Sequence, residues 1–219
     1  MSNNSKIQYK YYHWGPFLFH SKITPAECKM LIKEGKQCRN KSHDHRAKLA
    51  GHLSEEYTLE DTKGIIKWFE KYLIAYTNGY NEWRGKWRGN SSNLMTNLHI
   101  DIFWINYMKS NDFNPPHDHS GDLSFVIYPH IPKEIIKENK EYKGSATGPG
   151  GIGWFYGEGN RQYIDTVNMM PQTGDIFIFP ASLKHWVFPF RSNVERISVS
   201  GNISFGRQET HFLREKWNV

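Results

Sequence analysis

The segment GDIFIFPASLKHWVFPF, residues 174–190, decides the fold class of this chain. It holds two short runs rich in β-branched and aromatic residues, Asp175–Phe179 and His185–Phe190, with a turn between them. Such runs between Gly and Pro are typical of strands. The same period of two predicts three further strands: His99–Met108, Leu123–Tyr128 and Arg196–Phe205. The second half of the chain is therefore predicted to form a β-sheet core.

The first half shows helical patterns instead. Thr24, Pro25 and Glu27 combine a capping residue, a proline suited to the first turn and a capping-box acid. This helix is predicted to run to about Lys36. A second helix is predicted to begin after Thr58, with Asp61 as its capping-box partner. Its apolar stripe at helical spacing consists of Ile65, Ile66, Phe69, Leu73 and Tyr76.

Helices first and strands later, without β-α-β alternation, predict an α+β fold with an antiparallel sandwich or barrel. Residues 1–219 show no domain boundary and are predicted to form a single domain. Its parts are a mainly helical support over residues 1–96, a β core over residues 97–206 and a tail over residues 207–219. The Gly-rich insert at residues 144–159 lacks the Gly-Lys-Ser/Thr ending of a phosphate loop, so it is interpreted as a mobile connection or lid.

Composition narrows the class of protein. The chain has 219 residues with a net charge of +6 and 15% aromatic residues. No run approaches the roughly 20 apolar residues of a membrane span. The first residues lack a secretory signal, and two cysteines do not make a disulfide framework, so a cytoplasmic protein is expected. The basic stretch Trp83–Arg88 could stack bases and pair phosphates, but a solvated loop is favoured and nucleic acid is the less favoured partner.

The tripeptide His117-Asp118-His119 is a candidate metal motif. Side chains alternate along an extended segment, so His117 and His119 share a face and Asp118 points away. Two imidazoles on one face can chelate one metal ion. The same tripeptide at residues 43–45 has no strand after it and is interpreted as a solvated loop. The histidines interpreted as structural or without a pattern are His13, His20, His52, His99, His130 and His211.

A polar row is predicted on the strand that begins at Arg196. Small polar residues follow Arg196 on one face and apolar residues occupy the other. The polar members are Ser198, Ser200 and Asn202. In a barrel this face could line a cavity, where Arg196 and Ser198 would bind a carboxylate through charge-assisted hydrogen bonds.

With these motifs the chain resembles the Fe(II)/2-oxoglutarate-dependent oxygenases, in particular a bacterial and phage branch with a His-x-His…His pattern. The resemblance rests on HDHSGDLSFVIY, residues 117–128, and on residues 174–190 followed by ERISVSGNISF, residues 195–205. Trp104-Ile105-Asn106 matches a Trp-x-Asn that precedes the metal motif in that branch. The match spans about residues 97–206. It implies a double-stranded β-helix, or jelly-roll, core resembling that of the cupins.

The resemblance also implies the ligands. His117 and His185 match the family's first and distal metal ligands, and Arg196 with Ser198 matches the Arg-x-Ser that binds the far carboxylate of 2-oxoglutarate. His119 stands where the family usually has a carboxylate. Imidazole also suits iron, so His119 is expected as the third ligand, with Asp118 and Asp122 as alternatives. Asn106 and Ser124 are expected to make polar contacts near 2-oxoglutarate, with Tyr128 as a weaker candidate.

The implied activity is that of a dioxygenase that uses Fe(II), 2-oxoglutarate and O2, releases succinate and CO2, and hydroxylates a small molecule or protein side chain. Two alternatives stay open at this point. One is a cupin-like three-histidine dioxygenase that does not use 2-oxoglutarate, which the Arg196-x-Ser198 spacing disfavours. The other is a non-enzymatic jelly-roll module, for binding or in a virion, with a vestigial metal site, because one fold serves many functions.

Overall fold

The computed structural model describes residues 7–13, 15–41, 44–46, 51–59, 62–88, 98–157 and 166–206. The strands of these residues are β1 (Tyr9–His13), β2 (Phe17–Lys22), β3 (Glu55–Thr58), β4 (Leu98–Met108), β5 (Asn114–His117), β6 (Leu123–His130), β7 (Ile152–Phe155), β8 (Thr166–Met169), β9 (Asp175–Pro180), β10 (Lys184–Val187) and β11 (Arg196–Phe205). The helices are α1 (Pro25–Lys41), α2 (Thr62–Arg88) and α3 (Lys133–Glu141).

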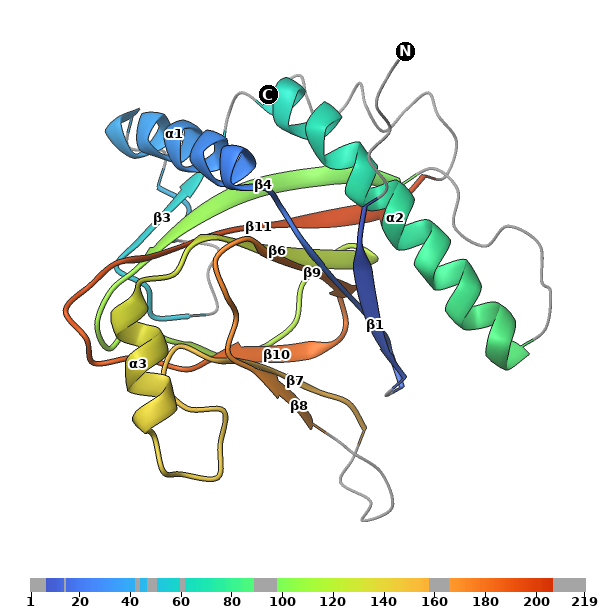
Figure 1. The fold of residues 1–219 in the computed structure, drawn as a ribbon. Helices are drawn as coiled ribbons and strands as arrows, with labels where there is room; N and C mark the ends of the chain where they lie inside the picture. Colours follow the sequence, from blue (N-terminus) through green and yellow to red (C-terminus); the bar gives the residue numbers. More distant parts are fainter. Residues whose placement is uncertain are drawn as a thin grey trace.

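The strands form two antiparallel sheets. The larger has seven strands in the order β1-β2-β9-β6-β11-β4-β3, and the smaller has four in the order β5-β10-β7-β8. Helices α1 and α2 cover one side of the large sheet, and the small sheet lies on its other side (Figure 1). The predicted α+β class with a jelly-roll core is confirmed. Among the described residues, no helix has the length and hydropathy needed to cross a membrane.

Alternate residues of β11 face two different parts of the interior, the core beneath the helices and the space between the sheets. Ile197, Val199 and Ile203 are buried in the core that the large sheet shares with α1 and α2. The alternate residues Arg196, Ser198 and Asn202 are also buried, although they are polar. They face the space between the two sheets, so the predicted polar row lines a cavity and not the solvent.

The first helix was predicted correctly at its start. The backbone N–H of Thr24 donates to Glu27 Oε2 over 2.6 Å, and the N–H of Glu27 donates to Thr24 Oγ1 over 3.3 Å, so the capping box is confirmed. The helix continues to Lys41, five residues beyond the expected end at Lys36.

The second helix was predicted to begin too early. Thr58 ends strand β3, where it pairs with Trp104, and α2 begins at Thr62. Ladder hydrogen bonds to β4 occupy the backbone of Thr58, which is therefore not a helix cap. Asp61 lies outside the described residues. The expected helical support over residues 1–96 did not include the three strands β1, β2 and β3, which extend the large sheet on both of its edges.

Two loop interpretations were also wrong. Residues Ile152–Phe155 of the Gly-rich insert form β7, which pairs with both β10 and β8, so this part is a strand and not a lid. The basic stretch Trp83–Arg88 is the C-terminal part of α2, not a loop. Helix α3 was not predicted, and the expected tail at residues 207–219 lies outside the described residues.

Candidate active site

Three histidines meet between the two sheets. His117 ends β5 and pairs directly with His185 of β10, and their ring centroids lie 4.2 Å apart. His119 follows two residues later, where its backbone N–H donates to the carbonyl of Ala181 over 3.0 Å. One ligand atom from each ring lies within 4.8 Å of the others. The two strands and the turn after β9 thus assemble a group with the donors and the spacing for one metal ion.

Hydrogen bonds fix the tautomers of two rings. Nδ1 of His117 lies 2.7 Å from the Pro115 carbonyl, and Nδ1 of His185 lies 3.1 Å from the Leu183 carbonyl. A carbonyl can only accept, so each Nδ1 carries the proton and each Nε2 has a free lone pair. Nε2 of His185 lies 3.3 Å from Nε2 of His119. This arrangement directs ligand atoms to a common centre.

Burial keeps these imidazoles neutral. It lowers the pKa of His117, and it lowers the pKa of His119 to about 4 with a further contribution from the charge of His117. The pKa of His185 is held well below its usual value by burial and by its two neighbours. Because the charged form is disfavoured in an apolar site, lone pairs are available for a metal at neutral pH.

Neither alternative carboxylate joins this group. Asp122 Oδ2 accepts a hydrogen bond of 2.7 Å from the backbone N–H of Phe205, at the end of β11. Asp118 is exposed and lines the cavity, but the described groups that could hold a metal include only the three histidines. The donor set thus fits a soft-to-borderline divalent ion such as Fe(II) and would leave coordination positions open.

The guanidinium of Arg196 is buried in the same cavity, without an ionic partner among the described residues. It is 3% exposed, its Nη1 donates to the Gly150 carbonyl over 2.9 Å, and its Nη2 contacts the sulfur of Met108. No ion pair involves Arg196 among the described residues, and its Nε is buried without a hydrogen-bond partner. A buried charge of this kind is costly unless an anion pairs with it, so the site fits a ligand carboxylate.

Tyr128 supports the same conclusion. Its ring centroid lies 5.4 Å from the guanidinium carbon of Arg196, and its hydroxyl is buried without a partner. Burial raises the pKa of Tyr128 to about 12, so the hydroxyl is a proton donor at neutral pH. Together Arg196 and Tyr128 offer donors to a negatively charged group.

The other predicted residues divide between the cavity wall and the layer behind it. Asn106 and Ser198 line the cavity, and Asn106 Nδ2 donates to Ser198 Oγ over 3.4 Å. Ser124 is buried but is not among the lining residues. Its hydroxyl donates to Asn202 Oδ1 over 3.1 Å, and Asn202 lines the cavity.

His45 and Glu56 are among the lining residues that sequence reasoning missed. His45, interpreted as part of a solvated loop, stacks on Trp104 with ring centroids 5.7 Å apart, and it lines the cavity. Glu56 also lines the cavity and is 1% exposed. The alternation of Glu55, Glu56, Tyr57 and Thr58 was the available signal, since one glutamate of such a strand must point inward. His43 lies outside the described residues.

The cavity that these residues line has a volume of about 580 Å³, within the usual range for small-molecule sites. Its wall includes the three histidines and Arg196, so one cavity holds the candidate metal group and the buried guanidinium.

Comparisons with known proteins give one family match and several similar folds. Residues 102–202 match the family model described as "Putative 2OG-Fe(II) oxygenase". Among curated proteins the sequence comparison found no match. The fold is similar to the viral collagen prolyl hydroxylase of Paramecium Bursaria Chlorella virus-1, with a TM-score of 0.54, 13% identity, and coverage of 86% of this chain and 96% of that one.

Two further solved structures share the fold. A prolyl-4-hydroxylase from Pseudomonas putida gives a TM-score of 0.55 at 12% identity, over 88% of this chain and 93% of that one. HygX from Streptomyces hygroscopicus, with nickel and 2-oxoglutarate bound, gives 0.52 at 7% identity, over 87% and 83%. At these identities the likeness concerns the fold.

Proposed function

We propose that this chain is a member of the 2OG-Fe(II) oxygenase family, that His117, His119 and His185 bind Fe(II) and that Arg196 binds 2-oxoglutarate. The chain is a 2-oxoglutarate-dependent dioxygenase, and its requirements are Fe(II), 2-oxoglutarate and O2. The overall reaction converts 2-oxoglutarate and O2 to succinate and CO2 while one oxygen atom is inserted into a substrate C–H bond.

The observation that carries the assignment is the shared cavity. Three neutral imidazoles with converging ligand atoms and a buried guanidinium without an ionic partner line the same space. A dicarboxylic acid with a keto group is matched to both features, because one end can chelate a metal and the other can pair with a guanidinium.

The iron supplies the oxidising chemistry when it is bound, and the protein supplies position and electrostatics. Nδ1 of His117 and of His185 stay protonated against backbone carbonyls, so that both rings keep their orientation. Arg196 is held by the Gly150 carbonyl and the Met108 sulfur, so its remaining donors are directed before the ligand arrives. Asn106 and Ser198 also line the cavity that holds the histidines and Arg196. We include Asn106, Ser198 and Ser124 among the residues that contact or support 2-oxoglutarate.

The substrate class and the cellular location are further parts of the proposal. We propose a small molecule or a protein side chain as substrate, since a cavity of about 580 Å³ holds 2-oxoglutarate together with one substrate group. A cytoplasmic location is consistent with Cys28 and Cys38, which are free thiols buried in the core.

An anaerobic titration tests the proposal. Fe(II) and 2-oxoglutarate are added to the wild type, to His185→Ala and to a matched control, His130→Ala, whose residue is exposed at the end of β6. We expect a visible charge-transfer band in the wild type and the control and none in His185→Ala. On admission of O2 the wild type should release succinate. A wild type that binds iron but neither binds nor consumes 2-oxoglutarate would sink the proposal in favour of a three-histidine dioxygenase, and one that binds neither would indicate a non-enzymatic module.

A further inference from the structure

We propose that Glu56 and Asn106 form a second subsite in the cavity, which takes a cationic nitrogen of the substrate, either an ammonium or a guanidinium group. The inference rests on the proposed function of the same cavity and specifies which substrates it accepts.

Strand pairing places Glu56 in one row with Asn106 and Ser198, which are proposed to contact 2-oxoglutarate. Glu56 of β3 lies opposite Asn106 of β4, and Asn106 lies opposite Ser198 of β11. All three side chains line the cavity. Adjacent strands are about 4.8 Å apart, so the backbone of Glu56 lies roughly 10 Å from the backbone of Ser198. The carboxyl is therefore on the side of Asn106 away from Arg196, where 2-oxoglutarate is not expected to reach.

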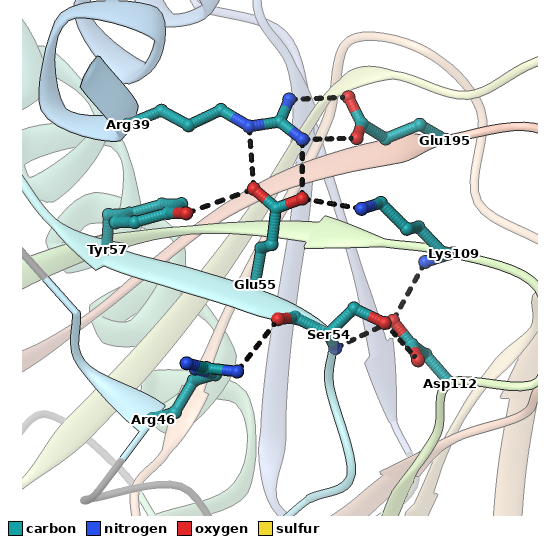
Figure 2. Close-up of polar contacts among 8 residues, drawn as sticks. All are labelled: Arg39, Arg46, Ser54, Glu55, Tyr57, Lys109, Asp112 and Glu195. Carbon is teal, nitrogen blue, oxygen red and sulfur yellow. Dashed lines mark hydrogen bonds and ion pairs between the residues drawn. The ribbon is translucent and has the colours of Figure 1, made fainter. Parts of the chain in front are cut away.

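Polar contacts on the outer face hold β3 in this register (Figure 2). Glu55 accepts two hydrogen bonds of 2.6 Å from Arg39, and Lys109 donates to it over 2.5 Å. Arg39 also binds Glu195 over 3.0 and 3.1 Å, which joins α1 to the loop before β11. Side chains alternate along a strand, so a Glu55 fixed outward directs Glu56 inward.

A second contact fixes the start of β3. The backbone N–H and the hydroxyl of Ser54 donate to Asp112 over 2.9 and 2.8 Å, as Figure 2 also shows. Asp112 also accepts from the backbone N–H of Lys109 over 2.9 Å. The loop after β4 thereby anchors the short strand, so Glu56 belongs to a rigid part of the wall.

The inward carboxyl of Glu56 is buried: the residue is 1% exposed, and its Oε2 has no hydrogen-bond partner among the described residues. Asn106 Oδ1 is also buried without a hydrogen bond. Asn106 Oδ1 is an acceptor, and Glu56 Oε2 becomes one when its carboxyl is ionised, so a donor would satisfy both atoms. Burial, together with the negative charge of Asp44, raises the pKa of Glu56 to about 8. Buried polar atoms without a partner are rare in folded proteins, and a ligand is one reason for them.

Charge favours a cationic donor over a neutral one. The carboxyl groups among the lining residues are Glu56, Asp101 and Asp118. Among the described lining residues, the only guanidinium or ammonium group is that of Arg196, which the proposed function assigns to 2-oxoglutarate. Arg39 and Lys109 are engaged on the outer face. A cation would supply the missing donor and also stabilise the ionised form of the buried carboxyl, whereas a hydroxyl would supply only the donor. Trp104 and His45 give the neighbouring wall aromatic surface, which suits cations as well.

Binding of matched probes tests the subsite. The wild-type protein is loaded with Ni(II), which does not support turnover, and with 2-oxoglutarate. It is then titrated with N-acetyl methylamides of arginine and lysine and with their uncharged counterparts, those of citrulline and norleucine, with calorimetry or NMR as the readout. We expect the cationic probe of at least one pair to bind about tenfold more tightly than its uncharged counterpart. Glu56→Gln should remove that preference, and the control Glu134→Gln, at an exposed position of α3, should keep it.

Each result decides the question. Equal affinity for cationic and uncharged probes, preference kept in Glu56→Gln, or no binding of either cationic probe at millimolar concentration would overturn the subsite. Glu56→Leu gives a second neutral variant if Glu56→Gln does not fold. Calorimetry of 2-oxoglutarate alone separates the two proposals. If the wild type binds 2-oxoglutarate but shows no preference for cations, only the subsite is overturned. If the wild type does not bind 2-oxoglutarate, the proposed function is overturned.

Discussion

Nε2 of His119 lies 3.3 Å from Nε2 of His185, although 66 residues separate them in the sequence. His185 is held by pairing between β5 and β10, and His119 by the hydrogen bond of its backbone N–H to Ala181. Both nitrogens belong to the group whose ligand atoms lie within 4.8 Å of one another, which is the spacing that the proposed metal ion requires.

The identity of the third ligand can be tested at His119. We expect His119→Ala to weaken Fe(II) binding by at least about tenfold and His119→Asp to retain most of it, because a carboxylate is also an iron ligand. Anaerobic Fe(II) titration measures both variants. His130→Ala, at an exposed histidine, is the control. Unchanged affinity in His119→Ala would exclude His119 from the ligand set.

Replacement of Arg196 by Met is expected to change affinity and stability in opposite directions. The variant loses the charged partner of 2-oxoglutarate, and its dissociation constant should rise by at least about thirtyfold. The ligand-free variant should be as stable as the wild type or more so, since a buried guanidinium without a counter-ion is removed. Calorimetry and urea unfolding measure the two effects. Arg191→Met, at an exposed position, should change neither, and normal 2-oxoglutarate affinity in Arg196→Met would count against the assignment.

Glu56→Gln is expected to alter the pH dependence of stability. The pKa of Glu56 rises from 4.5 to about 8 through burial and the charge of Asp44. Between these values the unfolded chain has released the proton and the folded chain has kept it, so wild-type stability falls as pH increases. The free energy of unfolding should fall by up to about 1.4 kcal/mol per pH unit relative to Glu56→Gln.

Urea unfolding from about pH 5 to about pH 8 measures this difference. Other groups near Glu56 on the preceding loop are Asp44 and His45, and both are retained in the variant. The control Glu134→Gln retains Glu56, so its stability should follow that of the wild type across this pH range. A constant difference between Glu56→Gln and the wild type would mean that Glu56 is already ionised in the folded protein.

Glu27 gives the opposite trend. Burial alone would raise the pKa of this carboxyl, but hydrogen bonds from Lys71, Thr24 and Trp68 outweigh burial and lower it to about 2. Its stabilising effect is thus present above pH 4.5 and is lost as pH falls toward about 2. We expect Glu27→Gln to lower the free energy of unfolding by about 1–3 kcal/mol at neutral pH, and by less in acid. Glu70→Gln, exposed on α2, is the control in the same denaturation series.

Gly150 should be sensitive to a single methyl group. Its φ is +71°, and a Cβ atom there would lie 2.3 Å from Cγ2 of Ile135. Gly150→Ala should therefore shift the carbonyl that accepts from Arg196 and weaken 2-oxoglutarate binding. Gly157→Ala is the matched control, since Gly157 has a φ of +85° and no atom within 4 Å of its Cβ position. Both variants carry about 1–2 kcal/mol of backbone strain, but only Gly150→Ala should affect affinity, which calorimetry measures.

Several features followed from the sequence because they depend on local pattern. The alternation of β11 predicted which side chains face the cavity, and strand pairing confirmed it. The capping box at Thr24 was predicted because its hydrogen bonds join residues three positions apart. The family motifs predicted the histidine group, whose members lie within the small sheet and its turns.

Features that depend on distant partners did not follow from the sequence. Strand β3 has four residues and is stabilised by β4, Arg39 and Asp112. The local sequence pattern therefore predicted the helix that follows but not the strand itself. For the same reason His45 and Glu56 were missed, because their place in the cavity depends on contacts across 50 or more residues, such as the pairing of Glu56 with Asn106.

The sequence by itself determined the fold class, the polar row of β11 and the residues of the histidine group, because each depends on short-range periodicity or on a motif. Only the tertiary structure decided that Arg196 has no ionic partner within the described part of the chain and that Glu56 points into the same cavity. Burial and the absence of a hydrogen-bond partner are properties of a packed environment, and segments far apart in the chain create that environment.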